Sequence, residues 1–147
     1  MSYFSRVAPA VLDELATWAG IEIYGRGETI HADGDPAEGL VFVLSGQVGF
    51  FARTHSGLAI ELESLGAGGV FGETAPGTRH FGSAVAMADS EVLVLDFSAL
   101  NALLRHEPGV VREMVNTVEA LQRAAEAVRS RPLGESVGKS PVMTSWR

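Results

Sequence analysis

Between residues 21 and 96, short apolar or alternating runs are separated by glycine-rich turns. Such runs are typical of β-strands, and their close spacing is typical of closed or double-sheet β folds. The turn signals include Gly25-Arg26-Gly27 and Pro76-Gly77. We therefore predict a mainly β fold, an eight-stranded double-sheet β-roll of the jelly-roll kind, with strands at 21–24, 28–31, 40–44, 47–52, 58–65, 69–71, 83–87 and 91–95.

The hydrophobic pattern changes to a helical one on both sides of this β region. Ahead of it, apolar residues at helical spacing predict a short helix at 8–19, which Gly20 ends. After residue 96, Gly and Pro become rare, and the pattern predicts a helix at 97–105. A second, long helix is expected from Pro108 to about residue 129, because proline is well tolerated in the first turn of a helix.

The long helix carries one apolar stripe whose members are spaced three and four residues apart. Polar and charged residues fill its other faces. Such a stripe commonly packs on the helix's own domain, but the strict alternation of three and four is also that of a two-helix seam. The rhythm favours a homodimer through parallel long helices, with an interface of Val111, Met114, Val118, Leu121, Ala125 and Val128.

Length and composition are those of a globular protein with one domain. The chain has 147 residues, of which 46% are hydrophobic and 20% charged. We expect this domain at 1–129, with the β-roll at 21–96 and the C-terminal helices at 97–129, followed by a flexible tail at 130–147 rich in Ser, Gly and Pro. Neither a membrane-spanning run nor the pattern of a signal peptide is present, so we expect a cytoplasmic protein without a membrane partner.

The charge distribution argues against direct binding of nucleic acid. Residues 129–147 hold four basic residues and one acidic residue, a local charge of +3. Since the whole chain carries −7, the remainder carries −10. An acidic body repels the phosphates of DNA and RNA.

Catalytic and metal-site chemistry has little support in the sequence. The absence of cysteine excludes disulfides, thiolate catalysis and cysteine-based metal sites. The four histidines, His31, His55, His80 and His106, share no metal-binding spacing. His31, between Ile30 and Ala32, is interpreted as a surface or half-buried strand residue. We expect no enzyme and no metal.

Several motifs occur in an order that resembles the cyclic nucleotide-binding domain family, which includes the sensory β-roll of CRP/FNR-like regulators. They are "GETIHADGD" at 27–35, "LVFVLSGQVGFF" at 40–51, "LGAGGVFGETA" at 65–75 and "DSEVLVLD" at 89–96, followed by two helices. The resemblance covers residues 8–128 and implies a β-roll that binds cyclic AMP or cyclic GMP. It also implies a relay of the binding event through the long helix.

By this resemblance, residues 71–83 correspond to the family's phosphate-binding cassette. Glycine allows close backbone approach, free N–H groups attract an anion, and a carboxylate accepts a hydrogen bond from a ribose hydroxyl. In the family a basic residue then pairs with the phosphate. The implied ligand-binding residues are Phe71, Gly72, Glu73, Thr74, Ala75, Arg79, His80 and Ser83.

The second half of the cassette departs from the family's pattern. Counting back from "DSEVLVLD", His80 occupies the place of the usual arginine, and Arg79 lies one position early. Pro76-Gly77 stands where a short helix is expected, and proline disfavours a helical residue before it. Two interpretations remain open: a site that binds an anion through Arg79 or His80, and a simple turn with a solvated Arg79.

Three functions are therefore compared. The first is a regulatory domain that senses a cyclic nucleotide. The second is a module of the same fold with a degenerate pocket, which acts in dimerisation or in binding a protein partner. The third and weakest is a cupin-like enzyme. The residues after the long helix are too few for the winged helix-turn-helix of CRP-like transcription factors, so we expect no DNA-binding domain of that kind.

Overall fold

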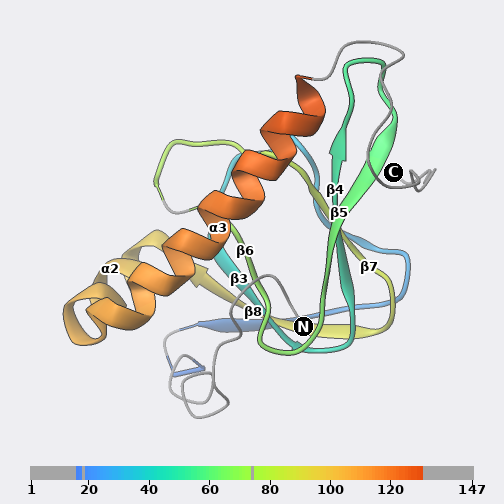
Figure 1. The fold of residues 1–147 in the computed structure, drawn as a ribbon. Helices are drawn as coiled ribbons and strands as arrows, with labels where there is room; N and C mark the ends of the chain where they lie inside the picture. The colour runs from blue at the N-terminus through green and yellow to red at the C-terminus, as the bar shows by residue number, and fades with distance from the viewer. Residues whose placement is uncertain (1–15, 18, 74, 131–147) are drawn as a thin grey trace.

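Two four-stranded sheets form a β-roll, and two helices follow it in this computed structural model, which describes residues 16–17, 19–73 and 75–130 (Figure 1). The eight-stranded prediction is confirmed, and the predicted boundaries of these strands and of the two helices that follow lie within one residue of the observed ones. The strands are β1 (Gly20–Tyr24), β2 (Thr29–His31), β3 (Gly39–Ser45), β4 (Val48–Arg53), β5 (Ala59–Leu65), β6 (Val70–Gly72), β7 (Ser83–Ala86) and β8 (Ser90–Asp96). The helices are α2 (Phe97–His106) and α3 (Pro108–Arg129).

Most of the predicted helix at 8–19 and nearly all of the predicted tail at 130–147 lie outside the described residues. Among the described residues, no helix is long and apolar enough to cross a membrane.

The order of the strands gives the roll two open sides. One sheet has the order β1-β8-β3-β6 and the other the order β2-β7-β4-β5, and all neighbouring strands are antiparallel. The edge strands β5 and β6 flank one open side, which we call the helix side because α3 covers it. The edge strands β1 and β2 flank the other, which we call the cavity side because their residues line a cavity.

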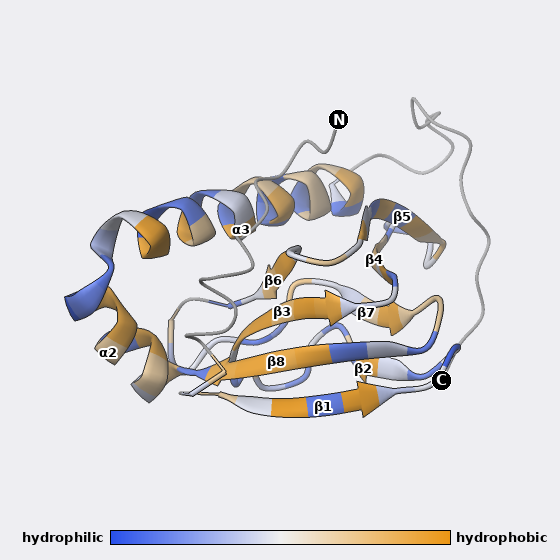
Figure 2. Cartoon of the chain, turned by 90° about the horizontal axis from the view of Figure 1, so that it is seen from below, coloured by the Kyte–Doolittle hydropathy of each residue, from blue (hydrophilic) through white to orange (hydrophobic). Residues whose placement is uncertain are grey.

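The apolar stripe of α3 closes the helix side. The helix contacts β4, β5 and β6 and lies along one side of the roll (Figures 1 and 2). All six residues of the predicted dimer seam belong to the domain's own hydrophobic core, with at most 6% of their surface exposed: Val111, Met114, Val118, Leu121, Ala125 and Val128.

This packing corrects the assignment of the stripe to a dimer interface. The physical reason is that the roll leaves an apolar side uncovered, and the nearest apolar surface that can bury it is the chain's own helix. A homodimer stays a prediction, but in this arrangement the six side chains are not available to a second copy.

The end of β8 leads directly into α2. Asp96 caps this helix, because its carboxylate accepts a hydrogen bond of 2.8 Å from the backbone N–H of Ala99. Arg105 and His106 in the last turn match the negative end of the helix dipole. Since α2 contacts β3, β8 and α3, it holds the long helix in place over the roll.

Candidate functional site

The second half of the predicted cassette is held by the loop between β2 and β3. Backbone hydrogen bonds join the two segments: Gly34 N–H donates to the His80 carbonyl at 2.9 Å, and His80 N–H donates to the Asp35 carbonyl at 2.9 Å. Ahead of His80 in the chain, Pro76 and Gly77 form a turn, in which Gly77 has a φ of 81°. Residues 75–80 contain no helix, so the chain passes from β6 to β7 through an extended loop fixed at its far end.

The first half of the cassette is positioned by close contact of two backbones. Gly72 has a φ of 115°, and a Cβ placed on it would lie 2.4 Å from the carbonyl oxygen of Gly39. Only glycine fits such an approach. The next residue, Glu73, donates its backbone N–H to the same Gly39 carbonyl at 2.9 Å. The contact between Gly39 and Gly72 thereby fixes the position of the Glu73 backbone, from which its side chain extends.

Glu73 is a buried acid, with only 4% of its surface exposed. Its Oε2 atom has no hydrogen-bond partner among the described residues. Burial raises the pKa of this carboxyl to about 7, although a hydrogen bond with the backbone of Phe81 acts in the opposite direction. A buried carboxyl oxygen without a partner is costly, and a ligand hydroxyl would satisfy it.

His80 is also buried, and its ring stacks on the ring of His31. The two centroids are 3.6 Å apart and the planes differ by 1°. Burial lowers the pKa of His80, against the influence of the nearby carboxylates of Asp35 and Asp33. Burial, with a smaller contribution from His80, lowers the pKa of His31 to about 3. Both imidazoles are therefore uncharged at neutral pH.

The interpretation of His31 as a surface or half-buried residue was wrong. His31 is 9% exposed and packs beside Phe71, with ring centroids 5.2 Å apart, and beside Phe50 at 6.3 Å. Neither of its ring nitrogens has a hydrogen-bond partner of good geometry among the described residues, and the same holds for Nδ1 of His80. Successive side chains of a strand point to opposite faces, so the apolar neighbours Ile30 and Ala32 gave no signal of this burial.

Arg79 and Ser83 are engaged in contacts with the neighbouring loop. The exposed Arg79 donates from its guanidinium to the carbonyl of Gly34 at 2.8 Å. The buried Ser83 accepts a hydrogen bond from the backbone N–H of Asp33 at 3.0 Å. Of the two basic candidates, His80 therefore lies inside and Arg79 outside.

The other predicted residues divide in the same way. Phe71 and Gly72 are buried in β6, whereas Ala75 is exposed in the turn. Thr74 lies outside the described residues. Phe50 and Phe81 complete the interior beside them, with ring centroids 5.3 Å apart. A Cβ on Gly82 would lie 2.6 Å from the Phe50 ring, so the aromatic packing against the cassette is tight.

A residue that the sequence did not single out, Arg129, connects α3 with the cassette. It donates to the carbonyl of Phe81 at 2.7 Å and forms an ion pair of 3.2 Å with Asp33. The last turn of the long helix is thus bonded to both segments that frame His80. The sequence offered no signal for this contact, because the partners lie 48 and 96 positions away.

The buried polar groups of this region are therefore Glu73 and the stacked histidines, and what they can offer is hydrogen bonding. Among the described residues, no group of three or more His, Asp or Glu side chains is arranged to hold a metal ion.

Comparison with known proteins agrees with this geometry. The sequence profile of the cyclic nucleotide-binding domain matches residues 21–107. The cyclic AMP receptor protein of Thermus thermophilus is 34% identical over 127 residues, which cover 84% of this chain and 58% of that protein. A CRP-like cAMP-activated global transcriptional regulator of Mycobacterium tuberculosis is 25% identical over 118 residues, covering 78% of this chain and 52% of the relative.

A solved structure of the same architecture supports the assignment. The crystal structure of the catabolite activator protein of Thermus thermophilus matches with a TM-score of 0.69 and 30% identity, over 82% of this chain and 58% of that one. The chain thus spans somewhat more than half the length of these relatives. From its motifs, its two-sheet β-roll with a long final helix and these matches, the chain belongs to the cyclic nucleotide-binding domain family, with the CRP/FNR-like β-roll.

Proposed function

We propose that residues 1–129 form a regulatory domain that senses a cyclic nucleotide, cyclic AMP or cyclic GMP, at the cassette. The observation that carries the proposal is the buried Glu73 carboxyl, whose Oε2 has no partner among the described residues at the point where β6 ends. A ribose 2'-hydroxyl placed there both donates to this oxygen and removes the cost of leaving it unpaired.

The phosphate would lie beside the backbone N–H groups of Gly72 and Ala75 and toward His80. His80 stands in the sequence position of the family's arginine, and its buried ring stacks on His31, which in turn packs beside Phe71. Because the neutral imidazole carries one N–H donor, it can hydrogen-bond an anionic oxygen, and a bound phosphate raises its pKa. In this scheme Arg79 does not contact the phosphate; its hydrogen bond to the Gly34 carbonyl fixes the loop between β2 and β3.

The binding event would reach α3 through Arg129. A ligand that moves residues 80–83 changes the hydrogen bond from Arg129 to the Phe81 carbonyl and the ion pair with Asp33. A ligand shifts the position of the helix only as far as it binds one arrangement more tightly than the other. Hydrogen exchange at residues 126–130, measured with and without nucleotide, tests the relay: unchanged protection in the saturated domain contradicts it.

A second candidate is a module of the same fold that acts through protein contacts and binds no nucleotide. One observation favours it: among the described cassette residues, the only arginine, Arg79, is turned onto the loop, and His80 is uncharged. In that case no positively charged side chain among the described cassette residues is placed to pair with a phosphate.

A thermal-shift screen with cyclic AMP, cyclic GMP and a cyclic dinucleotide separates the two candidates, with 5'-AMP as the linear control. A ligand at 100 times its Kd stabilises the folded domain by about 2.7 kcal/mol. The sensor proposal expects stabilisation by a cyclic mononucleotide and a weaker effect of 5'-AMP. If no nucleotide stabilises the domain at millimolar concentration, the module is the better account.

A further inference from the structure

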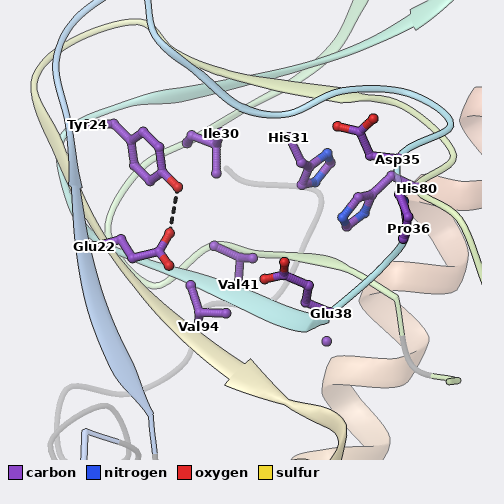
Figure 3. A pocket seen from close by; sticks show the side chains of 11 residues that line it. Glu22, Tyr24, Ile30, His31, Asp35, Pro36, Glu38, Val41, His80 and Val94 are labelled. Carbon is purple, nitrogen blue, oxygen red and sulfur yellow. Dashed lines mark hydrogen bonds between the residues drawn. The ribbon is translucent and has the colours of Figure 1, made fainter.

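The cavity side of the roll holds a cavity of about 400 Å³ (Figure 3). The edge strands β1 and β2, the β2–β3 loop and the inner faces of β3 and β8 line it. It shares only His80 with the predicted cassette residues, so it is a separate site from the proposed nucleotide position. Its volume is at the lower end of the range of small-molecule sites, about 300 to 1,000 Å³.

The charge of the lining is negative. Glu22, Asp35 and Glu38 contribute three carboxylates, and no Lys or Arg is among the lining residues. Glu22 accepts a hydrogen bond from the Tyr24 hydroxyl at 2.5 Å, and Asp35 accepts one from the Ala32 N–H at 3.3 Å. Burial and the nearby Glu22 raise the pKa of Tyr24, so the phenol stays neutral. An anionic ligand would be repelled by this lining, whereas a cation would be attracted.

Two buried histidines form one wall of the cavity. His31 and His80 are 9% and 7% exposed, and their stacked rings face the space between Tyr24 and the β2–β3 loop (Figure 3). Three of their four ring nitrogens are buried and have no hydrogen-bond partner of good geometry among the described residues. The torsion about χ2 of histidine is broad, so a ligand that displaces one ring from the stack would meet its lone pair. A neutral imidazole nitrogen with a lone pair accepts a hydrogen bond.

The acceptors are spread around the cavity. No three His, Asp or Glu side chains among the described residues are grouped as metal ligands. The carboxylates instead come from β1, the β2–β3 loop and its junction with β3, on different walls. Such an arrangement fits an extended cation with several N–H donors better than a single metal ion. The ring of Tyr24 adds an aromatic face, which attracts cations.

We infer that this cavity is a binding site for a small organic amine, whose ammonium groups donate to Glu22, Glu38 and the imidazoles of His31 and His80. The site does not depend on nucleotide binding at the cassette. Through His80, an amine in the cavity would contact the residue that we place next to the phosphate, so the two ligands would influence each other's affinity.

The test uses 1,4-diaminobutane as the probe in an NMR titration of the ¹⁵N-labelled chain. The matched control ligand is 1,4-butanediol, which has the same length and no charge. We expect the diamine to shift the amides of residues 30–31, 35 and 38–39, with binding that weakens as salt is added. Calcium chloride should not produce the same shifts, because a metal ion would find no grouped ligands among the described residues.

Two substitutions that each remove one negative charge distinguish binding in the cavity from attraction to the overall charge of the protein. Glu38→Gln removes a carboxylate at the mouth of the cavity and should weaken diamine binding by about two- to fivefold, the range of an exposed ion pair. Glu119→Gln removes an exposed carboxylate on α3 and should change it by less than about 1.5-fold. The inference is overturned if the diol shifts the same amides with similar affinity, if both variants weaken binding equally, or if the diamine shifts no amide of the cavity.

Discussion

The two open sides of the β-roll differ in what covers them. On the helix side, α3 places six apolar side chains over β4, β5 and β6, and none is more than 6% exposed. On the cavity side no described helix lies over β1 and β2, and the lining contains three carboxylates and two histidines. The same pair of sheets is thus closed by hydrophobic burial on one side and left polar on the other.

This difference separates stability from binding. Burial of apolar side chains stabilises a domain without making it specific for a ligand. Buried polar groups that lack partners lower its stability, and a ligand that supplies those partners recovers the loss. Glu73, His31 and His80 are of the second kind. We therefore expect substitutions under α3 to affect folding most, and substitutions of these polar groups to affect ligands and pH dependence.

The largest expected effect is that of Leu121→Glu on the helix side. Leu121 is 1% exposed, so the substitution removes a core side chain and places a carboxylate among apolar residues. We expect a loss of more than about 4 kcal/mol in the free energy of unfolding, measured by denaturant titration. The neighbouring Gln122→Glu adds the same charge at an exposed position and should cost less than about 0.5 kcal/mol.

The same experiment tests whether the stripe is a dimer seam. If Leu121→Glu keeps the unfolding midpoint of the wild type and only turns a dimer into a monomer in sedimentation, α3 does not close its own roll. That result would restore the seam that the sequence favoured and remove the contrast between the two sides.

The next effect concerns the backbone contact that places Glu73. Gly72→Ala puts a Cβ 2.4 Å from the Gly39 carbonyl at a φ of 115° and should destabilise the domain by about 2 to 4 kcal/mol. Gly77→Ala is the matched control, because φ is also positive, at 81°, but nothing lies within 4 Å. Its cost should be about 1 kcal/mol. Equal costs would contradict the close approach of β3 and β6.

Removing the charge of Glu73 should stabilise the free domain at high pH. The pKa of this carboxyl is about 7 in the folded state and 4.5 for an unperturbed glutamate, so the folded state binds the extra proton between these values. Stability then falls as pH rises through this window and stays lower above it. We expect Glu73→Gln to be more stable than the wild type by about 1 to 3 kcal/mol at pH 8 and nearly equal at pH 4.5. A loss of stability at pH 8 would instead make the carboxylate a structural acceptor.

The smallest expected effect is on the pH dependence of nucleotide binding. If His80 takes up a proton as it binds the phosphate, affinity should rise as pH falls from 8 to 6, by about tenfold in total for each unit by which the phosphate raises the pKa of His80. His80→Gln should abolish this slope, and Arg79→Gln should leave it unchanged, because arginine stays charged. Since Glu73 titrates in the same range and His31, Asp33 and Asp35 lie close to His80, the slopes are compared in a Glu73→Gln background.

The strands and helices were predictable because their signals are local. Positions such as Pro108 and the Pro76-Gly77 turn mark boundaries whatever lies around them. The apolar stripe of α3 was equally clear, but its spacing describes the face of a helix and not the surface that covers it. The burial of His31 was not predicted for a related reason. Its strand has only three residues, too few for the alternation of apolar and polar positions to show which face points inward.

The site was predictable only in part. Family motifs identified Glu73, but its placement depends on Gly39 and Phe81, which lie outside the motif that carries it. The contact between Arg129 and Asp33, 96 positions apart, follows from the path of α3 across the roll.

The most direct test of the central claim is a thermodynamic cycle on Glu73, measured by calorimetric titration. Cyclic AMP and 2'-deoxy cyclic AMP are titrated into the wild type and Glu73→Gln, with Glu119→Gln as the control for charge. We predict that the wild type binds cyclic AMP more tightly than the deoxy ligand by about 1.5 to 3 kcal/mol, the value of a hydrogen bond to a charged group, and that this difference shrinks in Glu73→Gln. An equal preference for the 2'-hydroxyl in both proteins, or no binding of cyclic AMP to the wild type, would contradict the assignment of Glu73 to a cyclic nucleotide.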